Sequence, residues 1–567
     1  MTEIGDTGVP GKDPFFDDVV VTTALRYRVC IRPVVLERRD TVTGARELVT
    51  VPCGHTQESK CPPCAKKAKA LRLAQCREGW HAEREPEIPK ARPTFDQTGL
   101  MCYRADLVAA LATAHRDGDT AEQAELREEI AWTDKQLTEL GMWGKPPAAD
   151  PADDASDPGA SGSEIEASDG ARRRSTRRRE DAADLPRLPI SDRTIGRQYA
   201  GRFRPSMMVT LTLPGYGRVC RDDGTPIDPD TYDYEAAAWD AIGFSRLFSR
   251  WVQTLRRATG VRLQYFAAVE PQRRGAPHVH LAIRGAIPHR IIRQITAATY
   301  HQMWWPQPGA HVYDDDRLPV FDRDAKTFVD PSTRAPLQGW DEAIEATFAE
   351  DAQPAHTVRF GVQVDSKGIL AGTPAADRSI GYLAKYLTKS VDEILEPRSA
   401  RQADHYDRLH ETLCRTPCSE RCAVWLLHGI VPKGAGARTQ PGRCKGRAHR
   451  RETLGLPGRR VLTSERWTGK TLGDHKADRM EFVRRTLAAA GIDKPAPDPR
   501  RYTWSTLAPG TRVPSRARLL LAAIAERIGW QAEYDRALPA VEPPPGARGA
   551  NSSAIRSTGD GQDGPVT

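Results

Sequence analysis

The sequence has 567 residues, more than one typical hydrophobic core accommodates, so it predicts two to four folded units joined by loose segments. Its 83 basic and 75 acidic residues leave a formal charge of +8, which permits an anionic partner such as DNA without requiring one. No run of about 18 apolar residues occurs, and residues 1–18 lack the basic and then apolar character of a signal sequence, so we expect a cytoplasmic protein without a membrane partner.

The first cysteine cluster lies in residues 51–144, after an N-terminal segment of residues 1–50. Most of the 11 cysteines fall into two local clusters with histidines nearby, which favours thiolate metal sites in a reducing compartment over disulfides. Four sulfurs, or three with His55, suit tetrahedral zinc, and the alternative is buried or free thiols. The surrounding Lys and Arg residues then predict a zinc-binding and helical DNA-binding module. Its expected ligands are Cys53, Cys61, Cys64 and Cys76.

A biased segment at residues 145–188 follows this module. Seven acidic residues stand between Asp150 and Asp169 among Ala, Ser, Gly and Pro, and an arginine-rich run follows at residues 172–179. Such a composition cannot bury a core, so the segment is predicted to be a disordered linker. The arginine run either contacts phosphate groups or is a solvated block of charge.

Residues 189–400 contain the most informative pattern. Residues 207–213 alternate apolar and hydroxyl side chains before a Pro-Gly turn, which predicts a strand. Residues 235–259 repeat large apolar side chains at steps of three and four, which predicts an amphipathic helix. Residues 261–270 and 278–284 predict the two strands of a hairpin. The order β, α, β, β predicts an α+β domain, an antiparallel sheet with flanking helices.

The second strand of this hairpin carries a His-Val-His sequence. The period of two sends His278 and His280 to one face, opposite the apolar residues. Neutral imidazoles are good ligands for a divalent cation, and Glu270, at the end of the preceding strand, can complete a set of two histidines and one carboxylate. Such a set leaves positions for water or a phosphate oxygen. The alternative is an ordinary strand with two histidines facing solvent.

A helix is predicted at residues 378–390, RSIGYLAKYLTKS. An apolar stripe through Ile380, Leu383 and Leu387 predicts the buried face. A tyrosine oxygen can attack phosphorus and form a phosphotyrosine if a cation neutralises the phosphoryl oxygens. The alternative is tyrosines packed at a surface among solvated lysines. The adjacent polar stripe consists of Tyr382, Lys385, Tyr386 and Lys389.

A second cysteine cluster lies in residues 401–480, in a basic stretch. Two pairs, Cys-x3-Cys and Cys-x4-His, offer four zinc ligands, and Cys414 is a spare. A zinc-ribbon-like module is expected here. Gly469-Lys470-Thr471 resembles the end of a phosphate-binding loop, but Ser464 replaces the leading glycine, so no ATP hydrolysis is predicted. The expected zinc ligands are Cys418, Cys422, Cys444 and His449.

The C-terminal part is predicted to be a helical segment followed by a tail. Residues 515–530 form an amphipathic pattern within the segment 481–542 and can support the fold, contact DNA or mediate association. Residues 543–567 are rich in Pro, Gly and Ser and are expected to be disordered.

Three motifs, MVTLTL, PHVHLAIRG and YLAKYLTK, together resemble those of rolling-circle replication initiators of the HUH endonuclease superfamily, in particular the actinobacterial plasmid and integrative-element type. The resemblance covers most of residues 200–480. It implies an HUH-like fold and a Mg²⁺ or Mn²⁺ ion on His278 and His280. Viral members of the superfamily also place an acid eight residues before the first histidine, where Glu270 stands. Both cysteine clusters resemble structural zinc segments beside the catalytic domain of these initiators.

The resemblance implies that Tyr382 and Tyr386 are alternate nucleophiles, one for initiation and one for strand transfer at termination. Single-tyrosine relatives keep the position of Tyr386, which favours it as the first nucleophile. We therefore predict a metal-dependent single-strand endonuclease and strand transferase that leaves a 3′-OH primer for a host polymerase, with a host helicase. The alternatives are a transposase or mobilisation relaxase of the same chemistry, or a zinc-containing DNA-binding regulator without nuclease activity.

Overall fold

The chain divides into two compact units in the computed structural model: residues Met1–Pro86 with Ala183–Thr567, and residues Glu87–Ala182. The predicted linker 145–188 lies outside the described residues except for 185–188, and the predicted tail 543–567 lies entirely outside them. The boundary at Pro86 divides the predicted module 51–144, so its four predicted zinc ligands and the two helices after Pro86 belong to different units. The structure describes residues 14–87, 94–142, 185–191, 195, 204–308, 312–314, 316–349, 352–385, 391–456, 458–489, 491–492, 501–508 and 510–537.

The smaller unit contains a helical hairpin of α3 (Phe95–Asp117) and α4 (Thr120–Glu139). Gly118, at φ 72°, ends α3 in the left-handed conformation, and the Asp119 carboxylate caps α4 by accepting from backbone N–H groups of its first turn. The hairpin has a small apolar core of its own, which explains why it separates from the rest of the chain. This core contains Leu107, Leu111 and Ile130.

The larger unit is built on a five-stranded sheet. All four neighbouring strand pairs are antiparallel, and α6 (Tyr234–Thr259) connects β3 to β4. The predicted α+β class and the order β, α, β, β are therefore confirmed. In spatial order the strands are β11 (Val364–Ala371), β3 (Arg204–Thr212), β5 (Pro277–Arg284), β4 (Tyr265–Pro271) and β13 (Val461–Thr463).

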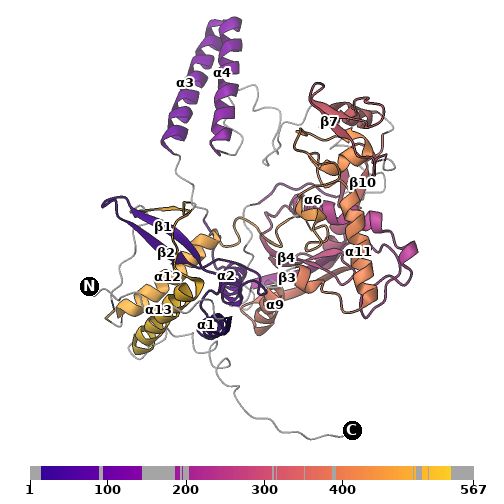
Figure 1. The fold of residues 1–567 in the computed structure, drawn as a ribbon. Coiled ribbons are helices and arrows are strands. Elements are labelled where there is room, and N and C mark those ends of the chain that lie inside the picture. Colours follow the sequence, from indigo (N-terminus) through magenta and orange to yellow (C-terminus); the bar gives the residue numbers. More distant parts are fainter. Residues whose placement is uncertain are drawn as a thin grey trace. The chain divides into compact units, whose positions relative to one another are not determined.

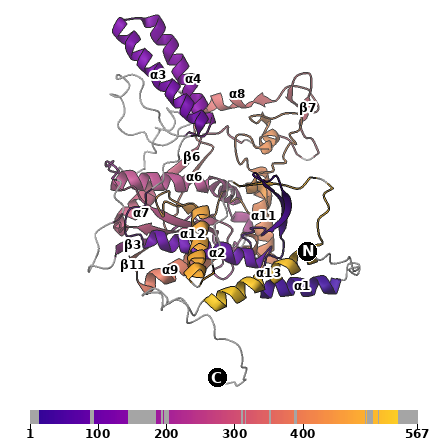
Figure 2. The ribbon, with the colours of Figure 1, turned by 90° about the vertical axis from the view of Figure 1, so that its left-hand side faces the viewer.

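Helices cover both faces of this sheet (Figure 2). On one face, α6 packs against apolar side chains that include Val279. On the other face lie α2 (Pro62–Trp80) and α9 (Pro374–Lys385), which pack against Phe266 and Ala282. The sequence predicted the first of these layers. The second layer brings α9 to the face that also carries the two histidines, because strand side chains alternate between faces.

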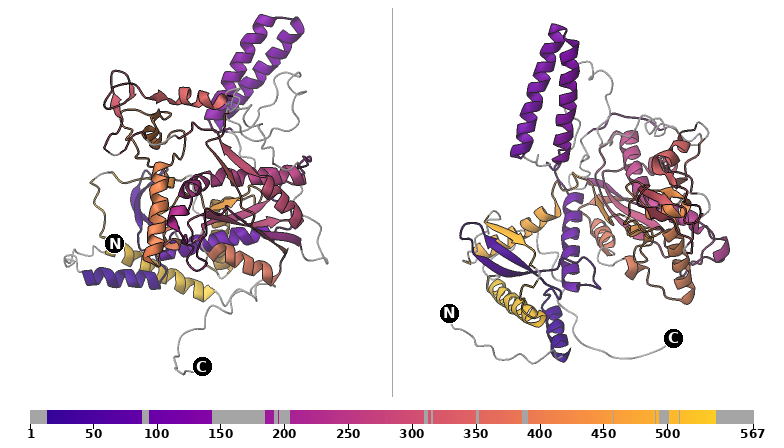
Figure 3. Two further views of the ribbon diagram at one scale, coloured as in Figure 1. Left: turned by 90° about the vertical axis from the view of Figure 1, so that its right-hand side faces the viewer. Right: turned by 45° about the horizontal axis from the view of Figure 1, so that its top comes forward.

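The two ends of the chain form one substructure of the larger unit (Figures 1 and 3). Apolar residues of α1 and α13 pack together, and strands from both ends pair in a three-stranded sheet ordered β14, β1, β2. Sequence analysis treated segments 1–50 and 481–542 separately, because partners this far apart leave no local pattern. The elements are α1 (Pro14–Arg26), β1 (Val34–Asp40), β2 (Arg46–Val51), β14 (Tyr502–Ser505) and α13 (Arg516–Ala537).

The other described elements surround the central sheet. Strand β6 pairs with β10, β7 with β8, and β9 with β12. Short 3-10 helices lie at residues 229–231, 346–348, 423–428 and 447–449. The elements are α7 (His289–Ala298), β6 (Tyr300–Met303), β7 (Val320–Asp322), β8 (Thr327–Val329), β9 (Gln338–Gly339), α8 (Trp340–Glu345), β10 (His356–Arg359), α10 (Val391–Ile394), α11 (Ala400–Arg415), β12 (Ile430–Val431) and α12 (Leu472–Ala489).

Candidate functional site

The hairpin of β4 and β5 brings the predicted two-histidine, one-carboxylate set together. Glu270 stands directly opposite His278 in the antiparallel register, and His280 is two residues further along the same strand. One ligand atom from each residue lies within 4.8 Å of those of the other two. The sequence placed the two histidines on one face and Glu270 at the end of the preceding strand, and the hairpin register accounts for the proximity of all three.

The two imidazole rings face each other through their Nε2 atoms. These atoms lie 2.9 Å apart, and the ring planes are nearly perpendicular, at 87°. On the far side of its ring, Nδ1 of His280 is 2.8 Å from the hydroxyl oxygen of Thr210 on β3. A proton on Nδ1 leaves the lone pair of Nε2 directed toward the centre of the cluster, which is the arrangement that a metal ligand needs.

Burial keeps both rings in their neutral form. Burial, with a smaller contribution from the neighbouring His280, lowers the pKa of His278 to about 3. Burial also lowers the pKa of His280 to about 4, against an opposing effect of the Asp365 carboxylate. Neutral imidazole is the form that binds a metal ion. Two neutral imidazoles and one carboxylate fit a divalent cation such as Mg²⁺ or Mn²⁺, with coordination positions left for a phosphate oxygen.

Helix α9 brings a tyrosine to this cluster. The hydroxyl oxygen of Tyr382 lies 3.4 Å from Nε2 of His280, and the two rings meet edge to face with centroids 5.0 Å apart. Ile380 and Leu383 are buried against the sheet, as the predicted apolar stripe requires, whereas Tyr382 is 45% exposed. The phenol therefore reaches both the candidate metal ligands and solvent.

The rest of the predicted polar stripe cannot be placed in the same way. Helix α9 ends at Lys385, whose side chain is outside the described part of the structure. Tyr386 and Lys389 also lie outside the described residues. Their predicted roles as nucleophile and cation stay predictions.

Arg460 is a residue near this cluster that sequence analysis missed. Its Nε donates to the carbonyl oxygen of Val269 at 3.1 Å, and the backbone N–H of Val269 donates to the Arg460 carbonyl at 2.7 Å. Burial lowers the pKa of the guanidinium, against the charges of Glu270 and Glu393. Arg460 belongs to no motif and lies 191 positions from Val269 in the chain, so no sequence signal could have found it.

The first thiol cluster has one ligand that differs from the prediction. Cys30 joins Cys53, Cys61 and Cys64, with Sγ–Sγ distances of 3.9 Å from Cys30 to Cys61 and 3.7 Å from Cys53 to Cys64. The predicted fourth ligand, Cys76, is instead buried in the apolar layer between α2 and the sheet.

Helix geometry explains this correction. Cys64 stands at the start of α2, and the twelve residues from there to Cys76 span about 18 Å of helix. The two sulfurs therefore cannot share one ion. His55, the other alternative, does not belong to the group either. Cys30 precedes Cys53 by 23 positions and lies in no spacing motif, so no local pattern could have identified it as a ligand.

The second thiol cluster contains the four predicted residues, Cys418, Cys422, Cys444 and His449. The Sγ atoms of Cys418 and Cys444 are 3.9 Å apart, and Nε2 of His449 is 3.3 Å from Cys422 Sγ. Nδ1 of His449 lies 2.8 Å from the carbonyl oxygen of Leu413, which holds Nε2 toward the sulfurs. Cys414 does not belong to the group. Both thiol clusters have the donor atoms of a structural zinc site and could bind zinc.

The loop at Gly469-Lys470-Thr471 has a structural role. The Lys470 ammonium pairs with the carboxylates of Glu78 at 2.8 Å and Asp478 at 2.9 Å. The backbone N–H of Thr471 donates to the carboxylate of Asp474 in the first turn of α12. These contacts fix α12 against α2 and use the groups that a phosphate-binding loop would need.

Comparisons with known proteins agree with the motifs. A family model described as "Replication initiator protein, pSAM2" (RepSA) matches residues 17–526. A curated replication initiator protein from Streptomyces ambofaciens is 26% identical over 226 residues, which cover 34% of this chain and 44% of the relative. The match thus spans less than half the length of that relative. No solved structure matches the chain.

Among the described residues, no helix has the length and apolar composition needed to cross a membrane. The family match covers most of the chain, including both thiol clusters, the histidine strand and the tyrosine helix. The chain therefore belongs to the family of pSAM2-type replication initiator proteins.

Proposed function

We propose that this initiator nicks one strand of its replication origin by forming a covalent phosphotyrosine bond, with Tyr382 or Tyr386 as the nucleophile. The observation that carries the proposal is the 3.4 Å distance between the Tyr382 hydroxyl oxygen and Nε2 of His280. A phosphate seated at the histidines would be within reach of that phenol. The antiparallel sheet with its histidine strand is also what an HUH-like endonuclease requires.

Glu270, His278 and His280 would hold the Mg²⁺ or Mn²⁺ ion. When bound, the ion would polarise the scissile phosphate and offset the negative charge on its oxygens. The neutral state of both imidazoles supports this role, because protonated rings could not bind a cation.

The nicking step exchanges one phosphodiester bond for another. The phenol oxygen attacks phosphorus and gives up its proton to water, and a new bond forms between the tyrosine oxygen and the phosphate. The bond from phosphorus to the 3′ oxygen breaks, and that oxygen takes up a proton. The 3′-OH then primes a host polymerase, while a host helicase unwinds the duplex. The second tyrosine would carry out strand transfer at termination, with Lys385 and Lys389 binding phosphates.

The two thiol clusters would bind structural zinc and hold their basic loops toward DNA. The family assignment favours replication initiation over transposition or mobilisation, which would use the same chemistry at other DNA sites. A DNA-binding regulator without nuclease activity would form no covalent adduct, so the following assay separates it from an endonuclease.

The test uses single strands from the origin labelled at either the 5′ or the 3′ end, incubated with Mn²⁺ and analysed on denaturing gels. We expect a covalent adduct that retains the 3′ label and a released fragment that retains the 5′ label. The Tyr382→Phe and Tyr386→Phe double variant should form no adduct, and chelator should abolish adduct formation by the wild type. Each single variant then reports which tyrosine attacks first.

A matched control is Tyr534→Phe, because Tyr534 is exposed to a similar degree, 38%, and lies on α13 away from the cluster. It should form adduct at the wild-type rate. Adduct formation by the double variant would refute the proposed role of these tyrosines.

A further inference from the structure

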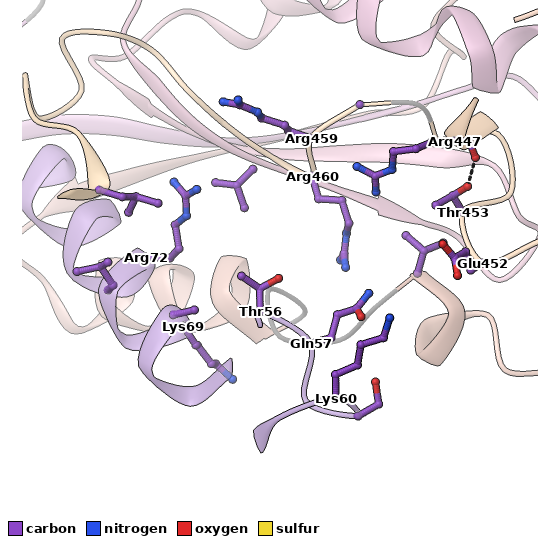
Figure 4. A pocket seen from close by; sticks show the side chains of 17 residues that line it. Thr56, Gln57, Lys60, Lys69, Arg72, Arg447, Glu452, Thr453, Arg459 and Arg460 are labelled. Atoms are coloured by element: carbon purple, nitrogen blue, oxygen red, sulfur yellow. Dashed lines mark hydrogen bonds between the residues drawn. The ribbon is translucent and has the colours of Figure 1, made fainter. Parts of the chain in front are cut away.

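Figure 4 shows a cationic pocket of about 390 Å³. One of its lining residues, Arg460, interacts electrostatically with the candidate metal ligand Glu270. Six basic side chains and a single acidic one, Glu452, line the pocket together with polar and apolar groups. Figure 4 shows Arg460 extending into the middle of the pocket, with Lys60 approaching it from the opposite wall. Its volume lies in the range of pockets that accept a nucleotide-sized ligand. The basic residues are Lys60, Lys69, Arg72, Arg447, Arg459 and Arg460.

Three separate parts of the larger unit supply these cations. Lys60 directly precedes Cys61 of the first thiol cluster, and α2 carries Lys69 and Arg72. Arg447 stands between Cys444 and His449 of the second thiol cluster. The remaining two basic residues lead into strand β13. Metal bound at the two thiol clusters would therefore hold opposite walls of the pocket in place.

Three of the cations of this pocket have no compensating carboxylate among the described residues. Within the described part of the chain, Lys60, Lys69 and Arg459 form no ion pair, and Glu452 pairs with Arg450 at 3.6 Å. Burial lowers the pKa of the Arg72 guanidinium, and repulsion by Arg459 lowers it further. Like charges held this close repel each other, and a bound anion would relieve the repulsion.

Arg460 links the pocket to the catalytic face. Its backbone carbonyl accepts a hydrogen bond from Val269, the residue that precedes Glu270 on β4. Its guanidinium interacts electrostatically with the Glu270 carboxylate. A residue that lines the pocket thus contacts the chain neighbour of a candidate metal ligand. A strand that leaves the scissile phosphate in this direction would enter it.

We propose that this pocket binds phosphodiester groups of the single DNA strand next to the nick site. The inference rests on the proposed function, because it takes the Glu270 cluster as the place of cleavage. The occupant is a DNA strand rather than a free nucleotide, because the six cations come from three separate segments of the chain instead of one compact anion site.

The test measures binding of a fluorescein-labelled oligothymidine strand by anisotropy at several salt concentrations, in the Tyr382→Phe and Tyr386→Phe background so that no cleavage occurs. Lys69→Gln with Arg459→Gln removes two lining cations that form no ion pair with any residue that the structure describes. We expect about tenfold weaker binding at roughly 0.1 M salt, and a slope of log affinity against log salt that is shallower by about 1.4. Oligothymidine makes the result independent of the origin sequence.

The control pair is Lys326→Gln with Arg290→Gln, which removes two exposed cations that belong neither to the pocket nor to the loops of the thiol clusters. It should change the affinity less than twofold. Equal losses from both pairs would overturn the proposal, as would binding of dTMP or inorganic phosphate as tightly as the strand. Adduct formation with intact tyrosines is scored separately. If the wild type forms no adduct but the Lys69→Gln and Arg459→Gln variant still binds the strand more weakly, the proposed nuclease activity is refuted and the proposed DNA-binding pocket stands.

Discussion

The hydroxyl of Thr210 lies 2.8 Å from Nδ1 of His280, on the neighbouring strand of the central sheet. In the metal-binding tautomer, Nδ1 carries the proton and donates it to the threonine oxygen. Thr210→Val keeps the shape of the side chain and removes this acceptor. We expect affinity for Mn²⁺ to fall by about 10- to 100-fold, because outer-shell partners orient the ligand ring. Mn²⁺ titration by calorimetry, and adduct yield against Mn²⁺ concentration, measure the change.

Thr212→Val is the matched control. Thr212 lies on the same strand, opposite His278, but its hydroxyl donates to the carbonyl oxygen of Gln363 at 3.1 Å instead of to a ring. Its Mn²⁺ affinity should stay within about twofold of the wild type, an estimate that follows from its absence from the ligand shell. If both variants lost Mn²⁺ affinity equally, Thr210 would affect metal binding only by supporting the sheet and not by orienting the ring of His280.

The zinc content of the chain is expected to separate Cys30 from Cys76. Cys30→Ser removes a sulfur of the first thiol cluster and should lower the zinc measured per chain by one, relative to the wild type. Cys76→Ala shortens a side chain in the apolar layer under α2 and should leave the zinc content unchanged, at a stability cost of about 1 kcal/mol. Elemental analysis of purified protein gives the answer. A loss of zinc in Cys76→Ala but not in Cys30→Ser would mean that Cys76 is the fourth ligand, as the local spacing predicted.

Acid should destabilise the larger unit through His301 on β6. Burial, with smaller contributions from the charges of Arg250 and Arg246, lowers the pKa of His301 to about 3. The unfolded chain, with an ordinary histidine pKa of about 6.5, takes up the proton first as the pH falls. The free energy of unfolding therefore falls by about 1.4 kcal/mol per pH unit below about pH 6.5. This loss continues until His301 of the folded chain also takes up a proton near pH 3.

His301→Gln keeps an acceptor for Arg250 and removes the titration. The difference in unfolding free energy between pH 7 and pH 5, measured with urea, should shrink by roughly 2 kcal/mol relative to the wild type. His289→Gln, which removes an exposed histidine of the same unit, serves as the comparison and should keep the wild-type difference. An unchanged difference in the His301 variant would show that this ring is protonated in the folded state.

Gly79 is expected to be intolerant of even a methyl group. A Cβ on this residue of α2 would lie 2.2 Å from Nε1 of Trp467, whose ring is fully buried against the helix. Gly79→Ala should therefore destabilise the larger unit by about 1–3 kcal/mol, although alanine favours helix more than glycine does. Thermal unfolding measures the loss. Gly529→Ala on α13 meets nothing within 4 Å and should be neutral or stabilising by up to about 1 kcal/mol.

The parts of the site that local pattern determines could be predicted from sequence. Period-two alternation set the face of His278 and His280, the hairpin brought Glu270 opposite them, and helical spacing separated Tyr382 from its buried neighbours. The second thiol cluster was also predicted in full, because each of its two halves is a short-range pair.

Partners that meet only through tertiary packing could not be predicted in this way. Cys30 reaches its cluster from the loop after α1, and Arg460 reaches β4 from a strand nearly two hundred positions away. The packing of α2 on the second face of the sheet could not be predicted either, because it depends on contacts between distant residues such as Gly79 and Trp467. No local periodicity records such pairings.

The pairing of β1 with β14 has a consequence for biosynthesis. Asp40 and Arg501 form an ion pair at 2.9 Å across 461 positions of the chain. At translation speeds of about 5–20 residues per second, the ribosome needs roughly 25–90 s to make the second partner after the first. During that time the edge of β1 has no neighbour on that side. A nascent chain would thus complete this three-stranded sheet only after β14 has been made, long after β1 has left the ribosome.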